Sequence, residues 1–290
     1  MQKVIVIAGP TGIGKTRLAL TLAMHLQGGI INADSMQVYK ELKIGTAKIE
    51  DQEQIRHHLI SIRSVRDPYN VYEYQKEGRH IMAEIIKRGK VPIIVGGTGL
   101  YIKALLYDYK FQPRTKVIDN NHFTNEELLA AIKEFEPNVN VHVNNRQRLL
   151  SLLARYQTGE IVKKAELCYD AIFIGLTMPR DRLYLCVNER VELMLKQGLV
   201  EEVRGLYEAG IKNRVLLSAI GYKELYQYFD GVLSYEESIA LIKRNTRRYV
   251  KRQYTWFKHQ LKLEWFVVDP KCFKKTEVIV KEYIEKLLIN

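Results

Sequence analysis

Cysteine, proline and long apolar runs are scarce in this chain of 290 residues, and each scarcity excludes a class of protein. The three cysteines (Cys168, Cys186 and Cys272) form no C-x-x-C pair, which predicts reduced cytosolic thiols rather than a disulfide or zinc framework. No apolar run approaches the ~20 residues that cross a bilayer. With 18 glycines and 7 prolines, the composition excludes collagen and low-complexity disorder.

The N-terminal residues show no secretion signal. Residues 1–7 enter a strand pattern at once, without a basic segment followed by an apolar segment and a cleavage site. We therefore expect a cytoplasmic protein that neither inserts into nor binds a membrane. Apolar residues make up 47% and charged residues 27% of the chain, which is typical of a soluble globular protein with a sizeable core.

Acidic residues are fewer than basic ones, and the imbalance is concentrated in one segment. The chain has 45 Lys and Arg against 33 Asp and Glu, a net charge of +12. Residues 243–264 alone hold eight Lys or Arg and one acid. A solvated helix face usually carries both signs, so this segment favours a polyanionic partner, either nucleic acid or phosphate.

Apolar runs and helical patterns alternate along most of the chain. Continuous apolar runs, typical of strands buried on both faces, occur at Val4–Ala8, Gly29–Ala33, Val91–Val95, Ala171–Leu176 and Glu264–Val268. Helical patterns occur at Lys15–Leu26, Tyr72–Arg88, Arg182–Ala209 and Tyr235–Leu263. This alternation predicts an α/β fold, a doubly wound parallel sheet with flanking helices.

One stretch interrupts the alternation. Residues 114–167 show no strand pattern but predict two helices, Asn125–Phe135 and Asn144–Tyr156, the first opening on the N-terminal signal Thr124 to Glu127. A stretch of this length is too long for a structureless loop. We predict a small helical insertion domain at 114–167 within a core of residues 1–113 and 168–290, with a thin core of its own and motion relative to the sheet.

A phosphate-binding loop follows the first predicted strand. Its residues, Gly9-Pro10-Thr11-Gly12-Ile13-Gly14-Lys15-Thr16, fit G-x-x-x-x-G-K-[ST] between a strand and a helix, the context that the motif requires. Backbone N–H groups and the helix N-terminus favour a phosphate here. Lys15 can reach the terminal phosphate, and the Thr16 hydroxyl can ligate Mg²⁺. A turn that binds nothing explains the Lys-Thr pair less well.

The motif alone does not identify the ligand that the loop binds. A kinase or ATPase usually has a second strand that ends in a metal-binding carboxylate, whereas Val91–Val95 is followed by Gly96-Gly97-Thr98-Gly99. A small-molecule kinase that uses ATP stays an alternative, as does a catalytically inert RNA-binding protein. The best-placed carboxylate is Asp34, at the tip of the second strand. Asp34 to Gln37 reads equally well as a helix capping box and as the site of a catalytic base.

The turn Gly97-Thr98-Gly99 also has two readings: a tight connection, or a source of hydroxyl and backbone donors that face the same cleft. His57 and His58 are expected to be surface residues rather than ligands.

Together these motifs resemble those of the bacterial tRNA dimethylallyltransferases, also called tRNA isopentenyltransferases, almost end to end. The resemblance rests on residues 9–16, Asp34-Ser35-Met36-Gln37-Val38-Tyr39, Gly45-Thr46-Ala47-Lys48, residues 95–101, 175–181 and 219–224, and Thr246-Arg247-Arg248-Tyr249-Val250-Lys251-Arg252-Gln253-Tyr254-Thr255-Trp256-Phe257. It implies a P-loop NTPase-like core and a monomer. It also implies transfer of a dimethylallyl group from dimethylallyl diphosphate to N6 of the adenosine 3′ of the anticodon, position 37.

The resemblance assigns roles to single residues. It implies that residues 9–16 hold the diphosphate, that Thr16 helps hold Mg²⁺, and that Lys15, Asp34 and Thr98 are catalytic, with Asp34 as the general base. The implied contacts to the tRNA anticodon stem-loop are Asp34, Ser35, Met36, Gln37, Thr98, Gln147, Arg148, Leu149, Leu150, Ser151, Arg244, Arg247, Arg248, Lys251 and Arg252.

The basic residues of the last group are regularly spaced. Arg244, Arg248 and Arg252 recur at i, i+4 and i+8 and so line one helical face, with Arg247 and Lys251 beside it. In an alternative interpretation, some of these arginines bind the diphosphate instead of tRNA. For Trp256 and Phe257, packing against the sheet is favoured over base stacking.

Overall fold

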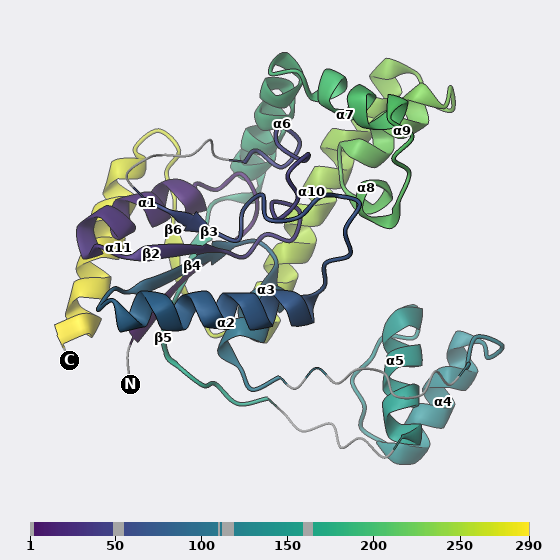
Figure 1. Cartoon of the computed structure of the whole chain (residues 1–290), viewed down its shortest axis with the longest axis horizontal. Coiled ribbons are helices and arrows are strands. Elements are labelled where there is room, and N and C mark those ends of the chain that lie inside the picture. Colours follow the sequence, from purple (N-terminus) through teal and green to yellow (C-terminus); the bar gives the residue numbers. More distant parts are fainter. Residues whose placement is uncertain (1–2, 49–54, 110, 112–118, 159–164, 290) are drawn as a thin grey trace. The chain divides into compact units, whose positions relative to one another are not determined.

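A computed structural model describes residues 3–48, 55–109, 111, 119–158 and 165–289 (Figure 1). Its strands are β1 (Lys3–Ala8), β2 (Gly29–Asn32), β3 (His57–His58), β4 (Pro92–Gly96), β5 (Asp170–Thr177) and β6 (Glu264–Val267). Its helices are α1 (Lys15–Leu26), α2 (Val71–Lys87), α3 (Gly99–Leu106), α4 (Asn125–Phe135), α5 (Arg146–Gln157), α6 (Arg180–Lys196), α7 (Leu199–Glu208), α8 (Arg214–Ser218), α9 (Tyr222–Phe229), α10 (Tyr235–Gln260) and α11 (Phe273–Ile289).

The described strands form one six-stranded sheet in the order β3-β2-β4-β1-β5-β6, and all neighbouring strands are parallel. Strand β1 lies in the middle, with Ala8 opposite Gly96 of β4 and Gly175 of β5. Alternate residues of β1 enter two different cores: Val4 and Val6 pack on one face, and Ile5 and Ile7 on the other. Burial on both faces explains the continuous apolar runs and confirms the predicted α/β class.

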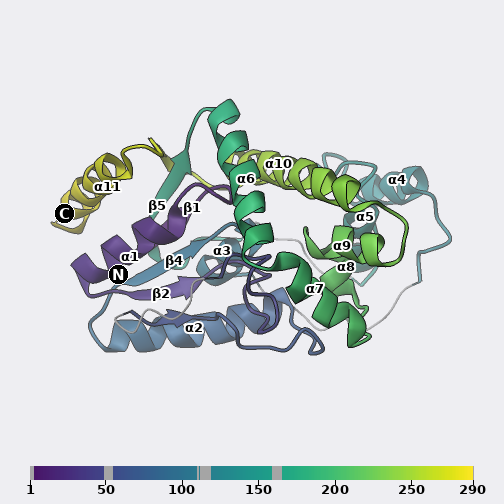
Figure 2. The same cartoon turned by 90° about the horizontal axis from the view of Figure 1, so that it is seen from above.

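Helices cover both faces of the sheet (Figures 1 and 2). Buried residues of α1, α6 and α11 pack on the face of Ile5 and Ile7. Buried residues of α2, α3, α7 and α9 pack on the face of Val4 and Val6. The 26-residue helix α10 contributes to both cores. Phe257 packs on the face of Val4 and Val6, and Val250 packs on the face of Ile5 and Ile7. The structure is therefore doubly wound, with helices on both faces of a parallel sheet.

The sequence predicted one helix over Arg182–Ala209, and this was wrong: α6 ends at Lys196 and α7 begins at Leu199. Gly198 lies between them with φ of 97°, a left-handed conformation that ends the first helix and redirects the chain. The two-residue strand β3 and the helices α3, α8, α9 and α11 were not predicted. Strand β3 and helices α3, α8 and α9 are short, whereas α11 is a helix of 17 residues that lies outside the predicted segments.

The chain divides into two compact units, residues 1–107 with 167–290, and residues 108–166. The sequence boundary between 113 and 114 lies outside the described residues. In the second unit, α4 begins and ends where the sequence predicted. Its capping box is present: Glu127 N–H donates to Thr124 Oγ1 (3.2 Å), and Thr124 N–H donates to Glu127 Oε2 (2.7 Å). The buried apolar residues described in this unit are Leu128, Ile132, Leu149 and Leu153, a thin core.

Across the described residues, no helix combines the length and the apolar character that a membrane crossing requires.

Two glycine substitutions test how closely the sheet is packed. A Cβ on Gly96 would lie 2.1 Å from the Ala33 carbonyl oxygen, a backbone atom of the neighbouring segment that cannot move aside. We expect Gly96→Ala to lower the free energy of unfolding by about 1–3 kcal/mol or more. Gly205, inside α7, has no heavy atom within 4 Å of that position. Gly205→Ala should raise the free energy by about 0.5–1 kcal/mol. Denaturant titrations measure both; equal effects would contradict this packing.

Candidate active site

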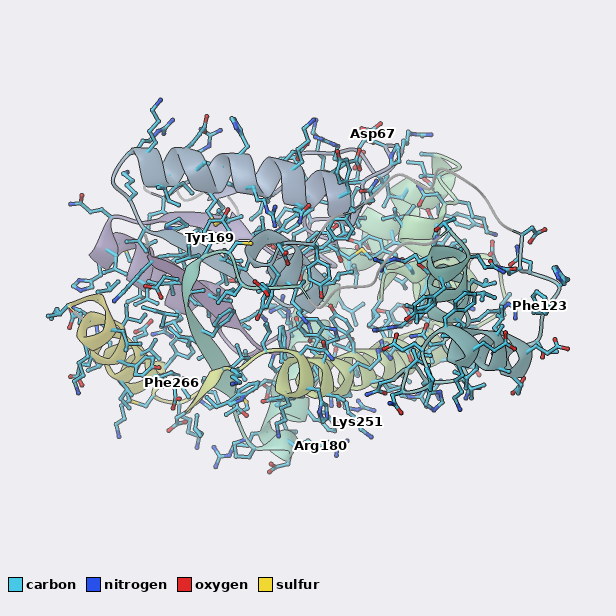
Figure 3. All side chains as sticks on the ribbon, turned by 90° about the horizontal axis from the view of Figure 1, so that it is seen from below. Asp67, Phe123, Tyr169, Arg180, Lys251 and Phe266 are labelled. Atoms are coloured by element: carbon cyan, nitrogen blue, oxygen red, sulfur yellow. The ribbon has the colours of Figure 1, made fainter. Side chains whose placement is uncertain are left out.

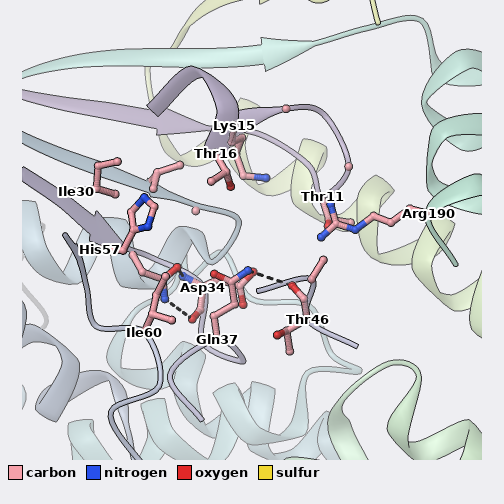
Figure 4. A pocket seen from close by; sticks show the side chains of 16 residues that line it. Thr11, Lys15, Thr16, Ile30, Asp34, Gln37, Thr46, His57, Ile60 and Arg190 are labelled. Atoms are coloured by element: carbon pink, nitrogen blue, oxygen red, sulfur yellow. Dashed lines mark hydrogen bonds between the residues drawn. The ribbon is translucent and has the colours of Figure 1, made fainter. Parts of the chain in front are cut away.

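A cavity of about 200 Å³ opens at the carboxyl ends of three neighbouring strands, where ligands bind in open α/β sheets (Figure 4). The loop after β1, the segment after β2 and the end of β4 line it, together with one residue of α6. The side chains of Lys15, Thr16, Asp34 and Arg190 all point into this space (Figure 4). The topology therefore brings the predicted residues Lys15, Thr16 and Asp34 together with Arg190, which was not predicted.

The loop between β1 and α1 has the conformation of a phosphate cradle. Gly14 is the N-cap of α1 with φ of 93°, and Gly12 has φ of 80°. A Cβ on Gly14 would lie 2.4 Å from the Phe273 ring, so both conformation and packing require glycine there. Of the predicted cradle residues, Ile13 turns its side chain into the core, which leaves its backbone for ligand contacts. The N-terminus of α1 points its free N–H groups at this loop.

Lys15 is half-buried, and within the described residues its ammonium group has one acceptor: Nζ donates to the Pro10 carbonyl oxygen at 2.7 Å. Burial lowers the pKa of Lys15 to about 7, an effect that nearby Asp34 opposes and nearby Arg190 reinforces. A partly buried cation with so few partners gains strongly from an anion placed next to it. Lys15 is thus poised to become fully charged when an anionic ligand enters the cavity.

Asp34 forms a turn rather than a helix cap. Its Oδ1 accepts a hydrogen bond from Met36 N–H (3.0 Å), and residues 35–38 form turns, not a helix. The Asp34 N–H donates to Asn32 Oδ1 (3.1 Å) rather than to Gln37, whose amide donates to the Thr46 carbonyl oxygen (3.0 Å), so no capping box forms. The capping-box reading was therefore wrong. Within the described residues, the second carboxylate oxygen of Asp34 has no hydrogen-bond partner and lines the cavity with the rest of the side chain.

Thr98 lies behind Asp34 instead of in the cavity wall. Its backbone N–H donates to the Ala33 carbonyl oxygen (3.0 Å), and its Oγ1 accepts a hydrogen bond from Ser35 N–H (3.1 Å). Thr98 is the N-cap residue of α3 but makes no side-chain cap bond to that helix. The predicted hydroxyl donor of the Gly97-Thr98-Gly99 turn thus holds the segment that carries Asp34.

A second cavity of about 280 Å³ shares Thr11, Asp34, Thr46 and Arg190 with the first. Most of its other walls are apolar and come from Met36, Val187, Val191, Met194, Leu199, Ala219, Ile220, Tyr222 and Ile242. Lys223, Tyr249 and Arg252 add polar groups. Burial, and then the neighbouring Asp34 charge, raise the pKa of Tyr249, which keeps its phenol protonated. Asp34 and Arg190 therefore stand where a charged chamber meets a mainly apolar one.

Arg190 is a site residue that the sequence analysis missed. It lies on α6 and lines both cavities, and within the described residues it makes no hydrogen bond or ion pair. Burial lowers its pKa, while Asp34 raises it. A signal was present: Arg190 falls among Leu183, Val187, Val191 and Met194 on the apolar side of an amphipathic helix. A lone charge on such a face indicates either a buried ion pair or a ligand contact.

His57 is less exposed than the sequence analysis predicted. It was expected at the surface, but it is half-buried in β3 and lines the phosphate-side cavity, with its ring near Thr16 and Ile30 (Figure 4). The pairing of Ile30 with His57 explains this position, because the short edge strand extends the sheet beyond β2. His58 is half-buried as well, and burial lowers its pKa.

The basic face of α10 is exposed, as the sequence predicted. Arg244, Arg248, Lys251 and Arg252 are exposed, and Lys251 projects outward from the helix (Figure 3). Arg252 also lines the apolar cavity, whereas Arg247 donates to Asn188 Oδ1 of α6 (2.9 Å).

The favoured core reading of the two aromatic residues is confirmed. Phe257 is fully buried, and the Trp256 ring presses against Gly99.

In the second unit, the predicted RNA-contacting residues lie on the first turns of α5. Gln147 and Arg148 are exposed there, and Leu150 and Ser151 are half-buried. Leu149 is fully buried in the small core of α4 and α5, so its side chain holds this unit together. Asn145 caps the helix, accepting a hydrogen bond from Arg148 N–H (3.3 Å).

The chain also matches known proteins. The model of a family described as IPP transferase matches residues 37–260. A tRNA dimethylallyltransferase of Anoxybacillus flavithermus is 44% identical over 98% of this chain and 96% of that protein. One from Bacillus subtilis is 41% identical over 96% of this chain and 95% of that protein. The chain belongs to the IPP transferase family. The resemblance seen in the sequence motifs is thereby confirmed, although the family match itself begins after Lys15 and Asp34.

Solved structures of IPP transferases agree in fold. A tRNA delta(2)-isopentenylpyrophosphate transferase of Staphylococcus epidermidis is 36% identical, with a TM-score of 0.76 and coverage of 99% of both chains. A eukaryotic dimethylallyltransferase acting on tRNA is 27% identical, with a TM-score of 0.81 and coverage of 99% of this chain and 80% of the other.

The lowered pKa of Lys15 predicts proton uptake when diphosphate binds. At pH 8 the side chain of the free protein is mostly neutral, because its pKa is about 7. A bound anion raises that pKa, so Lys15 takes up a proton, and affinity falls as pH rises above 7. Below pH 7 the side chain is already charged and the uptake disappears.

Calorimetry with inorganic diphosphate in buffers of different ionisation enthalpy measures this uptake. Lys15→Arg is the control, because arginine stays charged throughout and corrects for protons bound by the diphosphate itself. Equal uptake by the parent protein and Lys15→Arg would contradict a neutral Lys15.

Proposed function

We propose that this protein transfers the dimethylallyl group of dimethylallyl diphosphate to N6 of the adenosine 3′ of the anticodon, position 37, in tRNA. The carrying observation is that Lys15, Arg190 and Asp34 share one cavity that joins an apolar chamber. Membership of the IPP transferase family and the names of its relatives, which are tRNA dimethylallyltransferases, support the same reaction.

The first requirement is a stabilised leaving group. The bond between the allylic carbon and the diphosphate oxygen breaks, and negative charge develops on that oxygen. Lys15, Arg190 and the N–H groups of the cradle neutralise this charge inside a partly desolvated cavity, where electrostatic stabilisation is strongest. The mainly apolar chamber beside them suits the hydrocarbon part of the donor.

Mg²⁺ fits the same cavity. The Thr16 hydroxyl lines it next to Lys15, and hydroxyl and diphosphate oxygens are the hard ligands that this ion prefers. Among the described residues, no group of three or more His, Cys, Asp or Glu could hold a metal by itself. Thr16 would thus hold the ion together with the diphosphate, and the ion would add positive charge at the leaving oxygens.

The second requirement is a base. The lone pair of the adenine N6 amine is delocalised into the ring, so the amine must lose a proton as its bond to carbon forms. Asp34 supplies a carboxylate at the junction of the two chambers, with one oxygen occupied by Met36 N–H and the other available. General-base catalysis of this kind contributes about 10²–10⁴-fold.

The target base must leave its stack to reach Asp34, which costs less in an anticodon loop than in a duplex. The exposed Arg244, Arg248, Lys251 and Arg252 of α10 supply phosphate contacts to the anticodon stem-loop. Arg252 also lines the apolar chamber, and so connects the basic face to the site of reaction.

A P-loop kinase is the second candidate, and it is less well supported. Phosphoryl transfer from ATP usually needs a carboxylate for the metal at the end of a neighbouring strand. Here β4 ends at Gly96, and Gly97 and Thr98 follow. A leaving group that is released whole, without transfer of its terminal phosphate, needs no such carboxylate.

Asp34→Asn should abolish prenyl transfer. We expect labelled dimethylallyl diphosphate to modify an anticodon stem-loop with adenosine at position 37 and to leave the same stem-loop with guanosine unmodified. Asn keeps the turn bond from Met36 N–H but cannot accept a proton, so the rate should fall about 10²–10⁴-fold while RNA affinity changes little. Phosphate transfer from ATP without labelling of RNA would favour the kinase, and unchanged turnover in Asp34→Asn would remove Asp34 from its role.

Arg248→Glu should weaken RNA binding and reduce its salt dependence. Loss of one phosphate contact lowers the slope of log affinity against log salt by about one. The control is Lys87→Glu on α2, which makes the same change of charge at another exposed position. Equal slopes for Arg248→Glu and the parent protein in filter-binding titrations would exclude this face of α10.

A further inference from the structure

Gln253 is a buried polar residue on the helix that carries the basic face. It lies on α10 and is only 5% exposed. Tyr249, Gln253 and Trp256 follow one another at i, i+4 and i+7, so they share one side of the helix, while Arg248 and Arg252 are exposed. That shared side meets the turn Gly97-Thr98-Gly99.

The Gln253 side chain connects two loops that are far apart in sequence. Its Oε1 accepts a hydrogen bond from Thr11 N–H of the phosphate cradle (3.0 Å). Its Nε2 donates to the Gly97 carbonyl oxygen in the turn after β4 (3.0 Å). A primary amide supplies both an acceptor and a donor at this reach, whereas a carboxylate lacks the donor and a shorter Asn lacks the length.

The turn after β4 lies against α10 so closely that it requires glycine. A Cβ on Gly97 would lie 2.2 Å from Nε2 of Gln253, and a Cβ on Gly99 would lie 2.0 Å from the Trp256 ring. The turn is therefore held by the helix on one side. On its other side, Thr98 holds the Asp34 segment through Ser35 N–H and the Ala33 carbonyl oxygen.

These contacts form a continuous path from the cradle through Gln253, Gly97 and Thr98 to Asp34. We propose that Gln253 is a positioning residue, which fixes the separation between the diphosphate cradle and the segment that carries Asp34. This inference rests on the proposed function, since it assigns the two ends of the path to the leaving group and the base. Gln253 lines neither cavity, so it acts through Thr11 and Thr98 rather than on the substrates.

The test is Gln253→Met, which keeps the length of the side chain and removes both hydrogen bonds. Because misplacement of reacting groups by about 1 Å costs about 10²-fold in rate, we expect kcat to fall by about that factor. The KM for the stem-loop should change less than about twofold, because the basic face is untouched. Hydrogen exchange of peptides that contain Thr11 should become faster, a readout that does not depend on activity.

The matched control is Gln75→Met. Gln75 is also a buried glutamine, 7% exposed on α2, and it donates to the Ala104 carbonyl oxygen (2.7 Å) away from both cavities. It should lose stability in a similar way and keep its kcat. Gln253→Asn, which is too short to hold both bonds, serves as the second variant if Gln253→Met does not fold, and its kcat should fall as well.

The outcomes separate this inference from the proposed function. A parent protein that fails to label RNA contradicts the proposed function. Hydrogen exchange of the Thr11 peptide still tests whether Gln253 connects the cradle to the turn after β4. If the parent protein is active, a kcat within about threefold of it in the folded Gln253 variant overturns the inference. Equal losses of kcat in Gln253→Met and Gln75→Met, or unchanged exchange at Thr11, overturn it too.

Discussion

The site depends on two half-buried cations, Lys15 and Arg190, that have few partners among the described residues. In the part of the chain that the structure describes, Lys15 has one carbonyl acceptor and Arg190, which reaches the same cavity from α6, makes no hydrogen bond. Burial lowers the pKa of Lys15 to about 7. A positive charge that is partly removed from water and has few partners binds an anion strongly. The parallel sheet, the glycine-lined loop and the crossing of α6 all hold these two groups at one edge of the sheet. The proposed reaction follows from this, because the diphosphate that these charges bind is also its leaving group.

The reaction also requires a second set of constraints that keep the base at a fixed place. Asp34 is held by its own turn, by Asn32 and by Thr98, and Thr98 is in turn connected to the cradle through Gln253. Helix α10 thus has two different sides. One side is basic and exposed, and the other braces the loops around the cavity. This division explains why a single helix contains both regularly spaced arginines and buried aromatic and amide residues.

Much of this could be predicted from sequence because the signals are local. The apolar runs reveal β1, β2, β4 and β5, since a strand with a buried centre can be recognised without its partners. The edge strand β6 was predicted from its apolar residues too, although none of its residues is buried. The cradle and Asp34 follow strands directly, so their place at the sheet edge is a consequence of parallel topology. Arg190, His57 and Gln253 could not be assigned in this way. They reach the site through a helix crossing, an edge strand of two residues and a contact across more than 150 positions.

The most direct test of the account is a structure of the protein with a non-reactive analogue of dimethylallyl diphosphate and an anticodon stem-loop. We predict the diphosphate in the loop of residues 9–16, against Lys15 and Arg190. The free oxygen of Asp34 should lie within hydrogen-bond reach, about 2.6–3.2 Å, of N6 of the flipped adenine. A diphosphate bound elsewhere, or an adenine amine that faces away from Asp34, would contradict the central claim.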